Sequence, residues 1–230
     1  MSDEDKAAVA AHQAAASAAL TADAALRAAR VQGDSTAAGL EAQSSLTTGD
    51  YDTAFGANAQ QNLTYGSNDT AVGDGAQQNL TGGYYDTAVG SGAQQLLIGG
   101  AFDTAVGVLA QCSPLGNAAN ATTTASFQTS VGVNTGQSSA AQVDGITTIG
   151  YQATAGAANA TSIGREARAD HAGSIALGYQ ATTTQANQVM VGPRDVEITS
   201  ATKGIVLVSP GGTRYRVTVT NAGALVVTAA

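Results

Sequence analysis

Four aspartates recur every 17 residues, and their carboxylates are the side chains of this sequence best suited to chemistry. They are Asp52, Asp69, Asp86 and Asp103. If the repeats stack, the carboxylates form a column whose oxygen atoms could hold Ca²⁺. Dedicated calcium motifs rich in Gly and Asp are absent, so we expect each Asp to bond the backbone of its own turn as an Asx turn. The sequence therefore predicts no metal site and no cofactor.

The remaining polar residues show no spacing typical of a catalytic or metal-binding site. His12 and His171 are isolated, and no Gly-x-Ser-x-Gly nucleophile motif occurs. A single cysteine, Cys112, excludes an internal disulfide and a Cys-based zinc site. Gln pairs at 60–61, 77–78 and 94–95 are interpreted as stacked amide ladders, since few aromatic residues accompany them for glycan binding. We therefore expect no catalytic residues and no enzymatic activity.

These residues belong to a repeat that ends in glycine. Small and apolar residues precede each Gly, as in TAVG ending at 73, 90 and 107, TTIG ending at 150 and IALG ending at 178. The unit has 17 residues in the first half and 14 in the second, with a 25-residue interval after Gly107. Each unit reads as short strands joined by glycine turns, and a single unit cannot bury its own apolar face. The repeat thus predicts a mainly β protein with a β-solenoid over residues 51–192.

The large apolar residue before each glycine is predicted to form the repeat core. Strand alternation places these residues on one face, and stacking makes them a continuous row. The row consists of Val72, Val89, Val106, Val131, Ile149, Ile163, Leu177 and Val191. Because Ala and Val are too small to build a thick core in one chain, we expect burial against two neighbours in a homotrimer.

Residues 161–192, TSIGREARADHAGSIALGYQATTTQANQVMVG, resemble the head repeats of YadA-like trimeric adhesins. In that family a small or β-branched residue precedes Ala-Ile-Gly or Ala-Val-Gly, followed by two variable residues and Ala. The resemblance covers residues 51–192 and implies a left-handed parallel β-roll that packs as a trimer. The 17-residue units and the interval at 108–130 depart from the family's regular spacing.

The two ends of the sequence differ from the repeats. Residues 1–50 are predicted to be an Ala-rich helical attachment segment, with one helix over 3–31 and a short one around 36–46. Residues 193–230 are predicted to be a small antiparallel β-module, with strands near 204–209, 213–220 and 224–228. This module resembles a carboxy-terminal β-module of bacteriophage tail-fibre and virion proteins. Its candidate contact residues are Arg214, Tyr215 and Arg216, whose types are enriched at protein contacts.

Charge and hydropathy exclude some classes of function. A net charge of −8, from 17 acidic and 9 basic residues, argues against nucleic-acid binding and a polybasic membrane anchor. No stretch approaches the roughly 20 apolar residues of a membrane-spanning helix, so no membrane insertion is expected. The features together favour a structural trimeric fibre of a bacteriophage virion, on the capsid or the tail. Such a fibre would be made in the host cytoplasm, bind a virion protein through residues 1–50, and contact a host-surface glycan or protein.

Two other functions share some of these sequence features. A bacterial cell-surface trimeric adhesin head shares the repeats, but the secretion signal and four-stranded membrane anchor of that family are not found in the sequence. An ice-binding β-solenoid is suggested by a column of threonines at 53, 70, 87 and 104. We expect Gln128 and the residues after it to break this column.

Overall fold

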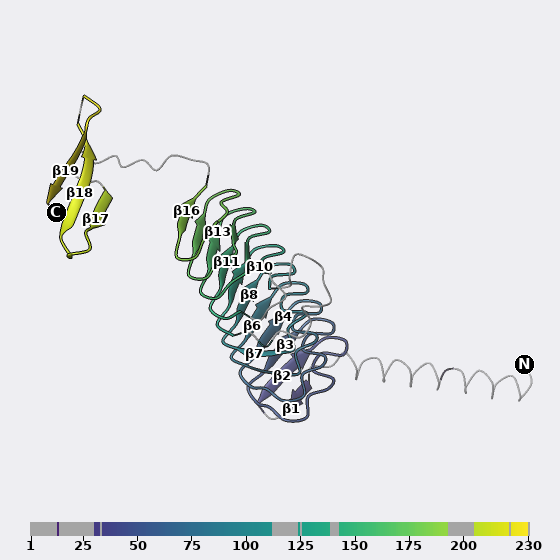
Figure 1. Cartoon of the computed structure of the whole chain (residues 1–230). Helices are drawn as coiled ribbons and strands as arrows, with labels where there is room; N and C mark the ends of the chain where they lie inside the picture. The colour runs from purple at the N-terminus through teal and green to yellow at the C-terminus, as the bar shows by residue number, and fades with distance from the viewer. Residues whose placement is uncertain are drawn as a thin grey trace, which may run out of the picture. The chain divides into compact units, whose positions relative to one another are not determined.

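The computed structural model describes residue 13 and residues 30–32, 34–111, 124, 126–138, 143–192, 205–220 and 222–229. The chain divides into two units, Met1–Pro193 and Arg194–Ala230. The first contains a parallel β-solenoid and the second a three-stranded antiparallel sheet (Figure 1). The mainly β fold, the solenoid and the small antiparallel module are therefore confirmed.

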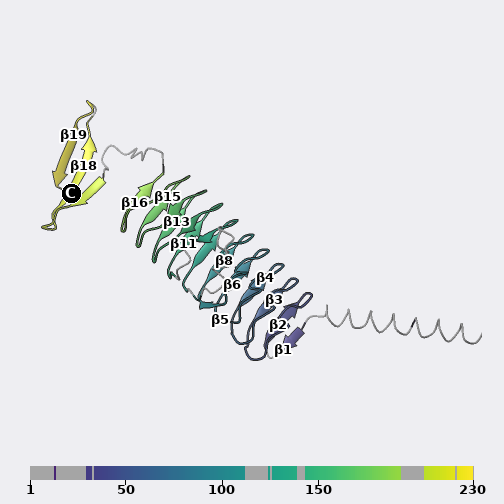
Figure 2. The same ribbon diagram turned by 45° about the vertical axis from the view of Figure 1, so that its right-hand side comes forward.

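The main sheet of the solenoid consists of short parallel strands, one from each turn (Figure 2). In stacking order they are β2 (Ser35–Ala38), β3 (Thr53–Phe55), β4 (Thr70–Val72), β6 (Thr87–Val89), β8 (Thr104–Val106), β9 (Thr129–Val131), β11 (Thr147–Ile149), β13 (Thr161–Ile163), β15 (Ile175–Leu177) and β16 (Val189–Val191). Each strand pairs with the next without a register shift, so equivalent residues of all turns form straight columns. At the amino-terminal edge, β1 (Arg30–Gln32) pairs antiparallel with β2 and covers its backbone.

Two smaller parallel sheets distinguish the two halves of the solenoid. In the 17-residue half, β5 (Gly82–Tyr84) pairs with β7 (Gly99–Ala101). In the 14-residue half, β12 (Thr154–Ala155) lies between β10 (Gly136–Gln137) and β14 (Arg168–Ala169). Both repeat lengths therefore use the same main sheet and differ in the path by which the chain returns to it.

A glycine follows the strands of the main sheet for a steric reason. At Gly90 the φ angle is +134°, and a Cβ atom there would lie 2.4 Å from the carbonyl oxygen of Gly107 in the next turn. Gly73 and Gly107 have the same conformation, with φ angles of +138° and +130°. No side chain fits such a position, so the glycine spacing of the sequence is a requirement of the stacking.

Small residues fill the interior. The middle residue of each three-residue main-sheet strand points inward, and in the first half this column is Ala54, Ala71, Ala88 and Ala105, all fully buried. A second side of the interior holds a leucine column, which consists of Leu46, Leu63, Leu80 and Leu97. In the second half Ile146 and further alanines take over. The core is thus a set of parallel columns only one side chain wide.

The predicted repeat core lies on the wrong side of the strands. Seven of its eight side chains are exposed in the single chain, with relative accessibilities of 37–43%, and Ile163 is half-buried. The seven are Val72, Val89, Val106, Val131, Ile149, Leu177 and Val191. The alternation was correct, but the inward residues are the alanines one position earlier. A coil of 14–17 residues per turn encloses too narrow a space for a valine column beside the other interior columns.

The predicted helical segment also needs correction where it is described. Arg30 and Val31 belong to strand β1, and the helix predicted around 36–46 is replaced by β2 and a turn of the solenoid. Apart from residue 13, the rest of the helix predicted over 3–31 lies outside the described residues. Among the residues that are described, no helix has the length and apolar character needed to cross a membrane.

Candidate functional site

The outer surface of the main sheet carries two parallel columns of side chains, which we call the Thr–Val face. One column is aliphatic or aromatic, and consists of the eight residues predicted as the repeat core together with Phe55. The other lies two residues earlier in each strand and consists of Thr36, Thr53, Thr70, Thr87, Thr104, Thr129, Thr147 and Thr161. The face therefore carries a threonine beside an aliphatic or aromatic residue at most turns, and neither column contains a charged residue.

The threonine column continues where the sequence predicted a break. Thr129 pairs with Thr104 on one side and with Thr147 on the other, so the column crosses the 25-residue interval unchanged. Gln128 belongs to a different column, that of the aspartates, and its backbone N–H donates to Asp103. The column ends after Thr161, where Ile175 and Val189 take the position.

The aspartate column lies in the interior and links neighbouring turns. Each Oδ1 accepts a hydrogen bond from the backbone N–H of the equivalent residue one turn further on. The distances are 3.0 Å from Asp69 to Asp52, 2.9 Å from Asp86 to Asp69, 2.9 Å from Asp103 to Asp86 and 2.8 Å from Gln128 to Asp103. The prediction of Asx turns within each repeat is therefore wrong, because the bonds run between repeats.

The other carboxyl oxygen, Oδ2, of all four aspartates is buried without a hydrogen-bond partner. Burial raises the pKa of Asp69 and Asp103 to about 8 and that of Asp86 to about 6, and it also raises the pKa of Asp52. The backbone N–H bonds lower these pKa values. Nearby carboxylates raise the pKa of Asp52, Asp69 and Asp103 further, and they include Asp50 and Asp144 at the two ends. Because a neutral carboxyl costs far less to bury than a carboxylate, this interior suits protonated aspartates.

The described residues do not gather these carboxyls into a metal site. No group of three or more His, Cys, Asp or Glu side chains among them could hold a metal ion. Each carboxyl is instead committed to the backbone of the next turn. The raised pKa values of these aspartates indicate that the column binds protons.

The glutamine pairs form the two amide ladders that the sequence predicted. The inner ladder is buried, with Nε2 of Gln60 donating to Oε1 of Gln77 at 2.9 Å and Nε2 of Gln77 donating to Oε1 of Gln94 at 2.8 Å. The outer ladder is half-buried and runs the opposite way, because Nε2 of Gln78 donates to Oε1 of Gln61 at 3.0 Å. Both ladders satisfy polar groups by stacking alone.

Two exposed ladders of aromatic side chains were not predicted from the sequence. Tyr85, Phe102 and Phe127 stack with ring centroids 5.2 and 5.3 Å apart and planes within 5°. All three have positive φ, 61–62°, a conformation uncommon for bulky residues. In the 14-residue half, the Arg165 guanidinium lies between the rings of Tyr151 and Tyr179, at 5.8 and 5.6 Å. The available signal was the aromatic residue that directly precedes Asp52, Asp86, Asp103 and Gln128 in the sequence.

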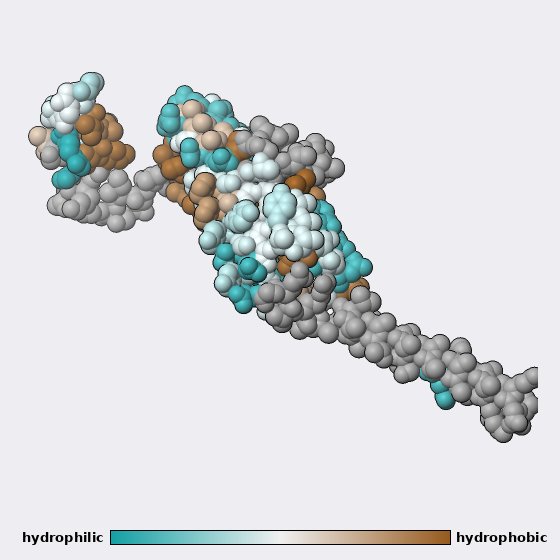
Figure 3. All heavy atoms as spheres, turned by 90° about the horizontal axis from the view of Figure 1, so that it is seen from below, coloured by the Kyte–Doolittle hydropathy of each residue, from teal (hydrophilic) through white to brown (hydrophobic). Residues whose placement is uncertain are grey.

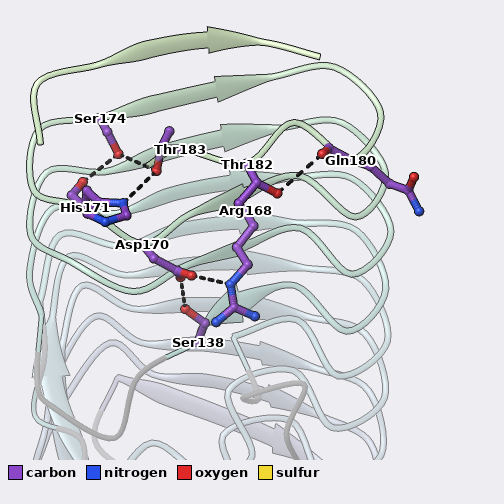
Figure 4. Close-up of polar contacts among 8 residues, drawn as sticks. All are labelled: Ser138, Arg168, Asp170, His171, Ser174, Gln180, Thr182 and Thr183. Carbon is purple, nitrogen blue, oxygen red and sulfur yellow. Dashed lines mark hydrogen bonds and ion pairs between the residues drawn. The ribbon is translucent and has the colours of Figure 1, made fainter. Parts of the chain in front are cut away.

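His171 occupies a turn, as predicted, and its neighbours do not form a nucleophilic triad (Figure 4). The Ser174 hydroxyl lies 2.6 Å from the backbone oxygen of His171 and 3.2 Å from Thr183 Oγ1. The His171 ring nitrogen Nδ1 lies 3.2 Å from the same Thr183 hydroxyl. Asp170 instead pairs with Arg168 and accepts a hydrogen bond from Ser138. The imidazole therefore activates neither serine, and the cluster is a set of polar links between turns.

The three candidate contact residues of the C-terminal module alternate across its central strand, β18 (Arg214–Val219). Arg214 and Arg216 pair with β17 (Ile205–Val208) on one face, and Tyr215 lies on the opposite face opposite Leu207. They therefore do not form a single contact patch. The module is completed by β19 (Leu225–Ala229), and all three strands agree with the prediction within two residues.

Comparisons with protein-family models, curated proteins and solved structures give no match to this chain.

Proposed function

We propose that the protein is a structural fibre of a bacteriophage virion, assembled as a homotrimer of left-handed β-rolls. The observation that carries this proposal is the Thr–Val face, an uncharged and partly apolar surface that runs along the described solenoid without interruption. Monomeric proteins rarely leave a contiguous apolar strip of this length in water. In a trimer, the three faces would cover one another around a common axis.

The solenoid supports such an assembly because its exposed side chains repeat along the whole stack of turns. Straight columns place an equivalent aliphatic side chain at every turn, about 4.8 Å apart, so three copies can interlock along their whole length. The resemblance of residues 161–192 to YadA-like heads and of the C-terminal module to phage fibre modules supports a role in adhesion or decoration. In this proposal, residues 1–50 bind a capsid or tail protein, and the rest of the fibre is exposed on the particle and contacts a host-surface glycan or protein.

Adjacent substitutions in β6 test this interface. Val89→Asp places a carboxylate on the Thr–Val face and should yield a chain with a β-type circular dichroism spectrum that sediments as a monomer. Ala88→Asp is the matched control, because Ala88 is fully buried and a charge there should prevent folding altogether. A trimer that persists in Val89→Asp would exclude this face as the interface, and a parent chain that sediments as a monomer would exclude the trimer.

A second function is favoured by the threonine column itself. Regularly spaced hydroxyls beside methyl groups on a sheet could bind an ordered water lattice, as an ice-binding surface requires. The column is longer than the sequence predicted, since it runs from Thr36 to Thr161 without a gap. The same face cannot serve both functions, because trimerisation would cover it.

Thermal hysteresis together with sedimentation separates the two functions. An ice-binding solenoid should be monomeric, depress the freezing point below the melting point, and lose that effect in Thr87→Tyr. A fibre should be trimeric and show no hysteresis.

A further inference from the structure

The C-terminal module has one face without charge, whose side chains are all aliphatic except that of Tyr215. Strand pairing places Ile205, Val217 and Val227 opposite one another, Leu207 opposite Tyr215 and Ala229, and Val219 opposite Leu225. Residues in register on antiparallel strands point to the same side, so these eight residues share one face. Figure 3 shows hydrophobic atoms gathered on one side of this module and hydrophilic ones on another.

This face has no cover within the described module. Ile205, Leu207, Val219, Leu225 and Val227 each retain 56–73% of their exposed area. The opposite face carries Arg214, Arg216, Thr218 and Thr228 among three valines, so the sheet separates an uncharged, mainly apolar side from a mixed one. Within the described residues of the module, nothing packs against the apolar side.

A unit of this size cannot supply that partner itself. It spans only Arg194–Ala230, and units below about 40 residues usually need disulfides, metals or association to be stable. The chain has one cysteine, outside this unit, which rules out a disulfide within it. No group of three or more His, Cys, Asp or Glu side chains among the described residues could hold a metal ion, so association is the route that remains.

We propose that the apolar face of the C-terminal module packs against the same face of the modules of the other copies of this chain. The proposal rests on the homotrimer proposed above. Identical faces without charge are compatible with one another, whereas the Arg214 and Arg216 side would remain outside, where the positive charges of different copies do not meet.

The apolar face is too small to hold free modules together, so its association depends on the covalent link of each module to the solenoid. Three strands about 4.8 Å apart and about five residues long present roughly 240 Å², against about 800 Å² per partner in a stable interface. Free modules would therefore associate weakly. Linked to a trimeric solenoid, they would meet at an effective concentration in the millimolar range, which is sufficient for a small apolar contact.

Cysteine cross-linking in the full-length chain tests the proposal. In a Cys112→Ser background, Val217→Cys places a thiol at the centre of the apolar face, and Thr218→Cys places one on the other side of the same strand. Disulfides need Cβ atoms about 3.5–4.5 Å apart. We expect mild oxidation to convert most Val217→Cys trimers to a disulfide-linked dimer plus one free chain, and Thr218→Cys to stay unlinked.

Sedimentation of the same samples separates this inference from the proposed trimer. A trimeric mass with the Val217→Cys link supports both. A trimeric mass without the link, or with equal linking of Thr218→Cys, overturns the packing of the modules and leaves the trimeric solenoid standing. A monomeric mass in the unoxidised parent overturns the trimer, and with it the tethered contact.

Discussion

Single residues control the interior of this solenoid, and the aspartate column is the clearest case. Four carboxyls lie in a row with one oxygen bonded to the next turn and the other without a partner. Their ionisation must therefore be coupled to the folding of the first half of the solenoid.

The pH dependence of stability follows from the raised pKa values. Unfolded aspartates titrate near 3.9, whereas Asp69 and Asp103 titrate at about 8 and Asp86 at about 6 in the fold. Between these values the folded chain binds more protons than the unfolded chain, so the free energy of unfolding falls as pH rises. We expect the denaturation midpoint to be highest near pH 4, to fall up to about pH 8 and then to level off.

An isosteric substitution provides the control for this prediction. Asp69→Asn keeps the Oδ1 acceptor for the Asp86 N–H and removes one titrating group, so its stability should depend less on pH and exceed that of the parent at pH 8. A parent whose stability rises between pH 5 and 8 would contradict the protonated column.

The glycine column gives a second prediction at this scale. Gly90→Ala would need a Cβ atom 2.4 Å from a backbone oxygen at a φ of +134°, and should destabilise the chain by several kcal/mol. Gly99→Ala is the control, because the nearest atom beyond its chain neighbours, the Gly82 carbonyl oxygen, would lie 3.3 Å from its Cβ and its φ is outside the left-handed region. Thermal melting should show a large shift for the first variant and a small one for the second.

At the scale of the elements, periodicity was predictable from the sequence and the direction of the faces was not. Glycine spacing identified the turns, and strand alternation identified the columns of Val89 and its equivalents. Hydrophobicity then suggested that the larger residue points inward. The narrow coil reverses this choice, because only Ala88 and its equivalents fit inside.

The exposed part of the candidate site was the least predictable. The threonine column was expected to break at Gln128, although the placement of Val131 in one row with Val106 already implies that Thr129 resumes the register of Thr104. The aromatic ladder was missed because Tyr85, Phe102 and Phe127 adopt a positive φ that their types do not favour.

The amide ladders allow a prediction about how elements hold together. Gln77→Met keeps the side-chain length but leaves Gln60 Nε2 and Gln94 Oε1 buried without partners, at a cost of about 2–4 kcal/mol. Gln78→Met breaks the half-buried outer ladder, where water can replace the lost bonds, and should cost under about 1 kcal/mol. Chemical denaturation of the two variants compares these costs directly, and equal losses would contradict a structural role specific to the inner ladder.

At the scale of the whole molecule, both described units present apolar faces that a single chain leaves exposed. The Thr–Val face and the face of the C-terminal module differ in length and composition, yet both are free of charge. Under the proposed trimer, one assembly step would cover both. Residues 1–50 then remain as the segment proposed to bind the particle, although the solenoid already begins within them at β1 and β2.

Because β1 and β2 lie within residues 1–50, two deletions of different length can test which end of the chain binds the virion. Removing residues 1–29 leaves β1 and β2 in place, so the chain should keep the sedimentation behaviour and the melting temperature of the parent. Removing residues 1–45 also takes away both strands, exposes the backbone edge of β3 and should cause aggregation. If residues 1–29 carry the attachment, the shorter deletion should no longer bind virions that lack their own copy of the protein. Binding that survives this deletion, but is lost when residues 194–230 are removed, would place the attachment at the other end of the chain.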